Sequence, residues 1–213
     1  SISNMSISTK SLEINNFLSF LRNLKQNPQI YILDKLIKKG YLVADIDLEF
    51  DKSGKVRDTY QIKGFVKDTK ISLFKNYNVE KLNFIFDIKK DLYNFTDLKL
   101  SFNEIPLFSD KISLKDASNF FLVEGKIQNK KVNLDKKKIN LLLKSQFFGE
   151  KLNDLTFKSI NNFSFKIDKE IKIKDLKFSS EIDLERLSFA YDTKLRNFFP
   201  KYKKELNFLN HKI

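Results

Sequence analysis

Apolar and polar residues alternate along most of the chain from Tyr41 onward. In one stretch, Leu82, Phe84 and Phe86 are separated by Asn83 and Ile85. A period of two gives a strand one apolar face and one solvated face, which is typical of antiparallel sheets. The candidate apolar lining predicted from this pattern comprises Leu82, Phe84, Phe86, Leu98, Leu100, Phe102, Phe163, Phe165, Ile167 and Phe178.

Short polar segments separate the alternating stretches and predict turns between strands. We expect more than half of residues 41–190 in antiparallel strands, arranged as an elongated meander of about ten to twelve strands. The meander would form one curved sheet or groove rather than a compact two-sheet sandwich. The predicted turns are Asp51–Gly54, Asn76–Asn78, Gln128–Lys130 and Asn161–Asn162.

The N-terminal forty residues have a helical period instead. Apolar residues at helical spacing predict a helix over about 11–26, with Ser11 as its N-cap. A second short helix is predicted from Pro28, with Gly40 at its C-cap, which completes a helical hairpin. We favour packing of this hairpin on a sheet end over contact with a membrane. The chain then divides into a helical segment 1–40, a repeat-containing β-sheet or groove 41–190, and a basic, helical tail 191–213.

An internal repeat supports the meander. Ile62–Leu73 aligns without gaps on Val123–Leu134, and both copies carry a glycine, Gly64 or Gly125, between β-branched positions. We interpret each copy as a strand bent at its structural glycine, a turn at Asp or Asn, and a return strand. A second echo relates Phe86-x-Ile88 and Asp97-Leu98-Lys99 to Phe165-x-Ile167 and Asp175-Leu176-Lys177.

The net charge of +13 has two explanations. Lys residues interleaved with Asp and Glu favour solvated strand faces, whereas a concentrated basic surface would favour a polyanion partner. The densest run, Lys136–Lys138, fits a solvated turn. Because Phe and Lys are predicted on opposite faces, aromatic stacking beside basic groups is not expected, and nucleic acid is not an expected partner.

The residues for catalysis and cofactor binding are sparse. The chain has no Cys and a single His, His211, so we expect no enzyme, no cofactor and no metal site. Asp45, Asp47 and Glu49 alternate along one predicted strand face, where water solvates them. No apolar run approaches the roughly 18 residues that span a bilayer, and no signal-peptide pattern occurs. We therefore expect a piece of a longer protein.

The glycine repeat units around Gly64 and Gly125 resemble the AsmA-like superfamily of envelope proteins (AsmA, YhdP and TamB types). Leu82–Phe86 with Phe95–Leu100, and the helix-Gly-strand junction Leu36–Val43, are also similar to this family. The resemblance covers about residues 30–190. It implies a long β-groove with an apolar inside, in a periplasmic protein tethered to the inner membrane through parts missing here. It further implies a role in phospholipid transport and outer-membrane biogenesis and homeostasis.

Three functions remain open on the sequence alone. The first is a lipid-binding groove segment whose partner is phospholipid or another acyl lipid. A chain of about sixteen carbons gains on the order of 13 kcal/mol on leaving water, so such a groove needs few specific contacts. The second is a structural or scaffolding β-repeat with fully buried faces, and the third is a polyanion-binding module. Alternation alone does not separate an open face from a closed core.

Overall fold

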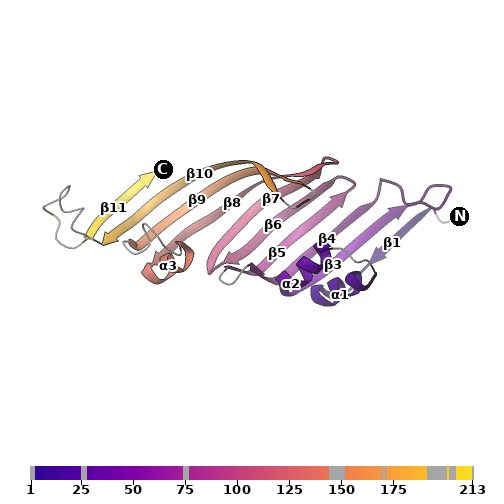
Figure 1. The fold of residues 1–213 in the computed structure, drawn as a ribbon, viewed down its shortest axis with the longest axis horizontal. Helices are drawn as coiled ribbons and strands as arrows, with labels where there is room; N and C mark the ends of the chain where they lie inside the picture. The colour runs from indigo at the N-terminus through magenta and orange to yellow at the C-terminus, as the bar shows by residue number, and fades with distance from the viewer. Residues whose placement is uncertain are drawn as a thin grey trace. The chain divides into compact units, whose positions relative to one another are not determined.

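A single antiparallel meander organises the chain in the computed structural model, which describes residues 3–24, 28–73, 77–143, 152–168, 170, 172–190, 201 and 205–212. The sheet has 11 strands in the order β1-β3-β4-β5-β6-β7-β8-β9-β10-β11, with β2 paired to β3 (Figure 1). Because this order has two ends, the sheet is open, and the predicted mostly-β meander is confirmed. The elements are β1 (Asn4–Ser8), β2 (Leu12–Glu13), α1 (Ile14–Leu24), α2 (Pro28–Leu36), β3 (Ile37–Glu49), β4 (Gln61–Leu73), β5 (Tyr77–Lys89), β6 (Leu92–Phe102), β7 (Ile105–Asp116), β8 (Phe120–Asp135), α3 (Lys136–Leu143), β9 (Leu152–Asp168), β10 (Ile173–Ala190) and β11 (Glu205–Lys212).

The chain forms two compact units that share three strands. Unit 1 comprises residues 1–127 and 162–178, and unit 2 comprises residues 128–161 and 179–213. Strands β8, β9 and β10 each contribute one part to either unit. The predicted lining residues all belong to unit 1, so the two units are described separately.

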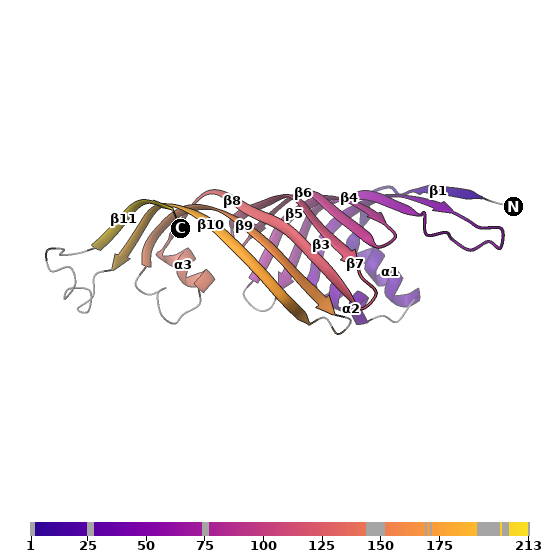
Figure 2. The same ribbon diagram turned by 90° about the horizontal axis from the view of Figure 1, so that it is seen from above.

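Strand register in unit 1 defines one apolar face. Residues directly opposite each other on neighbouring strands share a face of the sheet. Helices α1 and α2 pack on this same face, because an ideal Cβ at Gly40 of β3 would lie 2.9 Å from Ile14 Cδ1 of α1. We call this the inner face; Figure 2 shows both helices beneath the strands. One cross-strand row on it is Ala44, Gly64, Phe86, Phe95 and Ile112, from β3 to β7.

The strands are longer than the sequence suggested, because several predicted turns lie inside strands, the one at Asp68 beside a β-bulge. Strand β4 runs straight through Asp68, whose φ is +50°, and its pairing with β5 shifts register on either side. Strand β8 likewise runs through Asn129, and β9 through Asn161–Asn162. The predicted turns at these positions, and the return strand within each repeat copy, are therefore wrong. A bulge absorbs an extra residue without reversing the chain.

The internal repeat nevertheless has a structural basis. An ideal Cβ on Gly64 would lie 2.6 Å from Phe86 Cζ on the next strand, and one on Gly125 would lie 2.9 Å from Phe163 Cζ on the next strand. Each glycine thus accommodates a Phe ring. By this contact, Phe86 corresponds to Phe163. The sequence alignment instead matched Phe86 with Phe165, which is two residues further along the same face of β9. In the second echo, Asp97 of β6 and Asp175 of β10 both have a φ of +51°.

The N-terminal segment departs from the prediction at both ends. Helix α1 begins at Ile14, after the two-residue strand β2, so Ser11 is not its N-cap. Gly40 is not a C-cap but lies inside β3, with a φ of +151°. A Cβ there would sit 2.2 Å from Thr69 Oγ1, so glycine permits the close approach of β3 and β4. The two helices contact each other, with Arg22 Nη1 2.8 Å from Asp34 Oδ2.

Two further elements correct the sequence reading. Lys136–Lys138 is the first turn of α3 rather than a solvated turn, and the Asp135 carboxylate accepts the Lys138 N–H at 2.9 Å as an N-cap. The tail was predicted to be helical, but its described part is strand β11, paired with Asp183–Ala190 of β10. Residues 191–200 lie outside the described residues.

Unit 2 has its own small core and a buried polar network. Its most buried apolar residue is Ile139 of α3, which is 1% exposed. Across three strands, Ser159 Oγ donates to Asn129 Oδ1, Asn161 Nδ2 donates to Ser159 Oγ, and Ser180 Oγ donates to Asn161 Oδ1. These bonds satisfy polar groups that would otherwise be costly to bury. Asn129 and Asn161 are therefore structural residues rather than turn residues.

Candidate functional site

The inner face of unit 1 carries most of the predicted lining, and most of that lining is incompletely buried. Leu82 and Phe86 are buried, whereas Phe178 is exposed. A closed sandwich core would bury side chains of this size almost completely. The half-buried members are Phe84, Leu98, Leu100, Phe102, Phe163, Phe165 and Ile167.

The centre of the inner face is an aromatic cluster on β5 and β6. The Phe84 ring packs edge-on against the rings of Phe86 and Phe95, with centroid distances of 6.4 and 5.6 Å. Edge-to-face contacts of this kind hold the rings in place without covering their outer surfaces. Phe86 is buried and its ring packs against Gly64, while Phe84 remains half-exposed. The cluster is thus ordered and still accessible.

Leu98, Leu100 and Phe102 extend the inner face along β6. Phe102 lies opposite the buried Val79 on β5 and Ile105 on β7. Its ring also stacks on Tyr77, with centroids 5.8 Å apart and planes within 7°. The structure therefore joins these three predicted residues to the β5 cluster, as the alternation indicated.

A second aromatic pair lies on β9. Phe163 and Phe165 have ring centroids 5.9 Å apart, and Phe163 reaches the inner face beside Gly125 and Ile112. Phe165 also borders a hollow of about 560 Å³ that it shares with Glu124, Lys166 and other polar residues, so its surroundings are mixed. Phe178 stands apart from the cluster on the first part of β10.

Sequence reasoning missed two polar residues that are buried in unit 1. Thr69, 2% exposed, fills the space next to Gly40 and lies opposite Leu82. Ser109, also 2% exposed, lies opposite Leu98, and its Oγ has no hydrogen-bond partner among the described residues. Both are small, so they fit where neighbouring strands crowd together. The alternation of apolar and polar residues assigns small polar residues to the solvated face. The burial of Thr69 and Ser109 was therefore not predicted.

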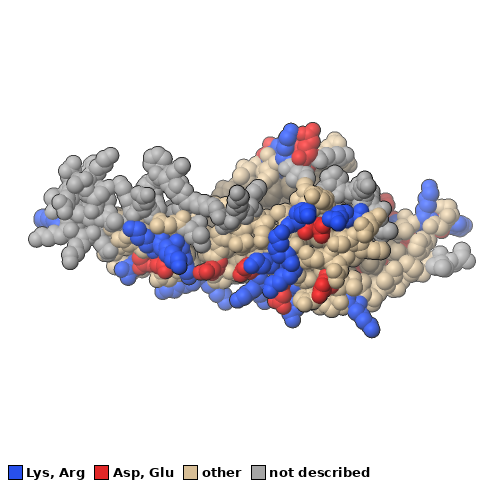
Figure 3. Space-filling view, turned by 60° about the horizontal axis from the view of Figure 1, so that its bottom comes forward, with Lys and Arg blue, Asp and Glu red and all other residues tan. Residues whose placement is uncertain are grey.

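The opposite face of unit 1, the outer face, alternates charges across strands. Asp45 of β3 lies opposite Lys63 of β4, which lies opposite Asp87 of β5. In the view of Figure 3, which looks at the lower edge of Figure 1 rather than onto the outer face, red acidic side chains also lie among the blue basic ones. Ion pairs hold several of the lysines and offset their charge locally. They include Lys70–Glu80 at 2.7 Å, Lys126–Asp110 at 3.6 Å, Lys166–Asp175 at 2.7 Å and, in unit 2, Lys158–Asp183 at 2.9 Å.

The outer face also carries exposed apolar residues that the alternation did not explain. Phe65 and Ile85 lie directly opposite each other on β4 and β5 and are 43% and 47% exposed. Such a cross-strand pair stabilises a sheet without a covering layer. Val43 of β3 lies opposite Phe65, so the three residues form a short apolar row among charged neighbours, which is ordinary for a protein surface. Phe65 therefore provides a matched control for substitutions of phenylalanines on the inner face.

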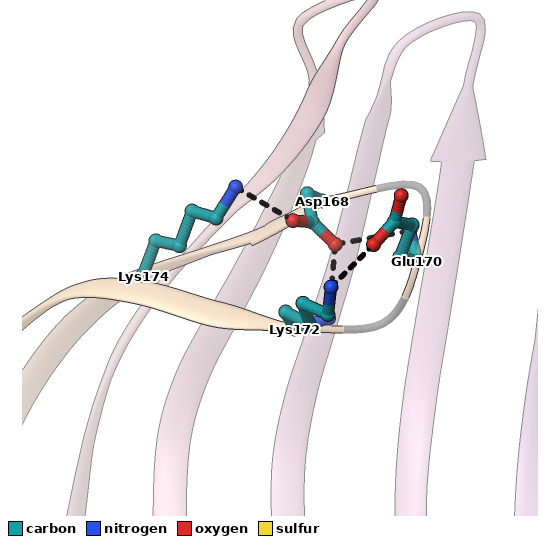
Figure 4. A network of polar contacts seen from close by, with 4 residues as sticks. All are labelled: Asp168, Glu170, Lys172 and Lys174. Atoms are coloured by element: carbon teal, nitrogen blue, oxygen red, sulfur yellow. Dashed lines mark hydrogen bonds and ion pairs between the residues drawn. The ribbon is translucent and has the colours of Figure 1, made fainter.

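An aspartate organises the turn between β9 and β10 (Figure 4). The Asp168 carboxylate accepts the backbone N–H groups of Glu170 and Lys172, each at 2.9 Å, and lies 2.8 Å from Lys174 Nζ. The Lys174 contact, followed by these backbone bonds, lowers the pKa of Asp168 to about 2. Asp51 accepts the N–H groups two and four residues ahead in the same way. The shared Asp-Lys-x-x-Lys pattern was visible in the sequence but was not used.

The described residues offer little else for chemistry. They contain no group of three or more His, Cys, Asp or Glu side chains placed to hold a metal ion. Among them, too, no helix combines the length and the apolar character needed to cross a bilayer. Asp45, Asp47 and Glu49 are exposed, and Asp47 and Glu49 accept hydrogen bonds from the Ser6 and Thr59 hydroxyls.

No protein-family model, no curated protein and no solved structure matches the chain. The functional argument therefore rests on the chain's own geometry.

Proposed function

We propose that this chain is a lipid-binding β-groove segment of an AsmA-like envelope protein. Its parent protein would be tethered to the inner membrane and would contribute to phospholipid transport between the inner and outer membranes. The observation that carries the proposal is the half-exposed apolar inner face of unit 1. Phe84, Phe102 and Phe163 share this face across β5, β6 and β9, and each remains partly accessible.

The physical basis of the proposal is the free energy of covering this face. Exposed apolar surface costs roughly 25 cal/mol per Å² relative to burial, so an acyl chain lying along the rings would stabilise both partners. The inner face presents rings and aliphatic side chains whose contacts are non-directional. A lining of this kind would bind acyl chains without selecting one headgroup. Such contacts would let a lipid slide along the groove.

Two observations favour lipid over the alternatives. A buried scaffold requires a closed face, whereas the inner face of unit 1 keeps seven of its predicted lining residues half-buried. A polyanion site requires concentrated, unpaired positive charge, whereas the outer-face lysines named above are paired with carboxylates. Exposed ion pairs add little stability, but they do balance the local charge.

Lipid retention tests the proposal. The chain purified from a bacterial host should carry phospholipid that mass spectrometry detects in an organic extract. Phe84→Glu places a carboxylate on the accessible inner face and should reduce the bound lipid at least tenfold while the protein stays folded. The matched control is Phe65→Glu on the outer face of the neighbouring strand, which should retain lipid. Equal retention by both variants, or lipid-free wild-type protein, would refute the proposal.

A further inference from the structure

The helical hairpin of α1 and α2 packs on the sheet through only one side of α1. That side carries Ile14 and Leu18, which are both buried. Phe20 lies two residues beyond Leu18, which is about 200° around a helix with 3.6 residues per turn. Its side chain is 58% exposed. Packing on the sheet therefore leaves part of the apolar surface of the hairpin uncovered.

Helix α2 exposes a wider apolar surface. Its Asp34 carboxylate faces α1, where it lies 2.8 Å from Arg22 Nη1. Ile32, two residues before Asp34, therefore points away from α1, since two residues turn a helix by about 200°. Tyr31, Ile32 and Leu33 are 52%, 44% and 46% exposed. A single exposed apolar side chain is ordinary, whereas several in succession indicate a contact surface.

Positive charge surrounds this apolar surface. Lys35 Nζ lies 5.5 Å from the centre of the Tyr31 ring, one helical turn away, and Lys38 Nζ donates to the Lys35 carbonyl oxygen at 2.6 Å. Within the part of the chain that the structure describes, neither lysine has a carboxylate at ion-pair distance. The hairpin thus complements a partner that is both apolar and negatively charged. Over residues 14–39 the sequence sets a single acidic residue, Asp34, against the basic residues Arg22, Lys25, Lys35, Lys38 and Lys39.

A membrane interface fits this surface better than a folded protein does. Three successive helical positions spread their side chains over about 200° of the circumference, whereas a helix packs on protein through a stripe of roughly 100°. A helix lying in the headgroup region sinks into it, so side chains over the wider sector are all covered. Lysines beside them add attraction to anionic headgroups. Tyr31 suits the boundary, because its ring is apolar and its hydroxyl is polar.

We propose that the α1–α2 hairpin is a peripheral docking surface for an anionic phospholipid membrane. Tyr31, Ile32 and Leu33 insert into the interface, and Lys35 and Lys38 contact the headgroups. The buried side of α1 stays packed on the sheet, so docking needs no rearrangement of unit 1. This docking is distinct from lipid binding along the inner face, and either can hold without the other.

An introduced tryptophan tests the insertion, because the chain contains no Trp. Ile32→Trp replaces a side chain that is 44% exposed, and the matched control Phe65→Trp replaces one that is 43% exposed on the outer face. Each full-chain variant is shown to be folded by circular dichroism and is mixed with vesicles of equal parts phosphatidylglycerol and phosphatidylcholine. The emission of Ile32→Trp should shift to shorter wavelength and be quenched by lipids brominated on their acyl chains. The emission of Phe65→Trp should not change. No shift for Ile32→Trp, or an equal response of both variants, would overturn the proposal.

Co-sedimentation with the same vesicles tests the role of the lysines. The double variant Lys35→Gln with Lys38→Gln should bind about tenfold more weakly than the wild type, since each lysine near an anionic surface adds to the attraction. The control, Lys63→Gln with Lys67→Gln, removes the same charge from exposed positions on the outer face of β4 and should bind like the wild type. Equal losses in the two double variants would overturn the proposal. So would equally tight binding of the wild type to vesicles of phosphatidylcholine alone.

Discussion

Replacing Gly64 by Ala tests the packing that supports the inner face. Gly64 lies on β4 between Ala44 of β3 and Phe86 of β5. An ideal Cβ at this position would be 2.0 Å from the Val43 carbonyl oxygen and 2.6 Å from Phe86 Cζ. The backbone contact cannot be relieved by a side-chain rotation, so strand β3 itself has to move.

The matched substitution is Gly125→Ala. A Cβ there would lie 2.9 Å from Ile112 Cγ1 and from Phe163 Cζ, which are side-chain atoms that can shift. Overpacking in a sheet or core costs about 1–3 kcal/mol. We therefore expect Gly64→Ala to lower the free energy of unfolding by about 3 kcal/mol or more. Gly125→Ala should cost about 1 kcal/mol, partly offset by the roughly 0.5 kcal/mol that alanine contributes over glycine in a strand.

Urea unfolding followed by circular dichroism measures both changes. The absolute values matter less than their order, since both variants share the same host and the same substitution. A Gly64→Ala protein within about 0.5 kcal/mol of the wild type, or less destabilised than Gly125→Ala, would refute the proposed register of β3, β4 and β5.

Three further outcomes follow from named contacts. Because the folded pKa of Asp168 is about 2, below its ordinary 3.8, its turn contacts stabilise the β9–β10 hairpin above about pH 4. They are lost as the pH falls through 2, which amide hydrogen exchange of the turn should detect, while loss beginning near pH 6 would contradict this. Asp97→Gly and Asp175→Gly should leave stability nearly unchanged because both positions have positive φ, whereas Asp97→Val should cost about 1–2 kcal/mol in thermal unfolding. Finally, Phe86→Glu should lower the free energy of unfolding by about 3 kcal/mol or more, because the Phe86 side chain is only 7% exposed. Phe84 is half-exposed, so the Phe84→Glu protein should remain folded. Equal effects of the two substitutions would show that the two rings are equally buried.

The fold class could be predicted because alternation with a period of two is a local property of each strand. Leu82, Phe84 and Phe86 fall on one face as predicted, since nothing interrupts the pleat between them. Turns were harder to predict. Asp68 and Asn129 resemble turn residues, but Asp68 has a positive φ beside a β-bulge and Asn129 is buried inside a long strand. Whether such a residue forms a turn or lies within a strand depends on pairing with strands that are distant in the sequence.

The openness of the inner face could not be predicted either. Half-burial of Phe84 and Phe163 follows from the absence of a second layer over them in the described part of unit 1, and alternation is the same with or without one. Helical tails pose a related difficulty. Leu206 and Phe208 were predicted to lie in a helical tail. They lie instead in strand β11, opposite Phe189 and Leu187 of β10, because strand pairing outweighs local propensity there.

Photo-crosslinking at two matched phenylalanines tests most directly whether lipid lies on the inner face. The photoreactive amino acid benzoylphenylalanine replaces Phe84 on the inner face in one variant and Phe65 on the outer face in the other. Both variants are produced in a bacterial host, irradiated in cells and analysed by mass spectrometry. The account predicts phospholipid adducts at position 84 and none at position 65. Adducts at both positions in equal yield, or at neither, would contradict it.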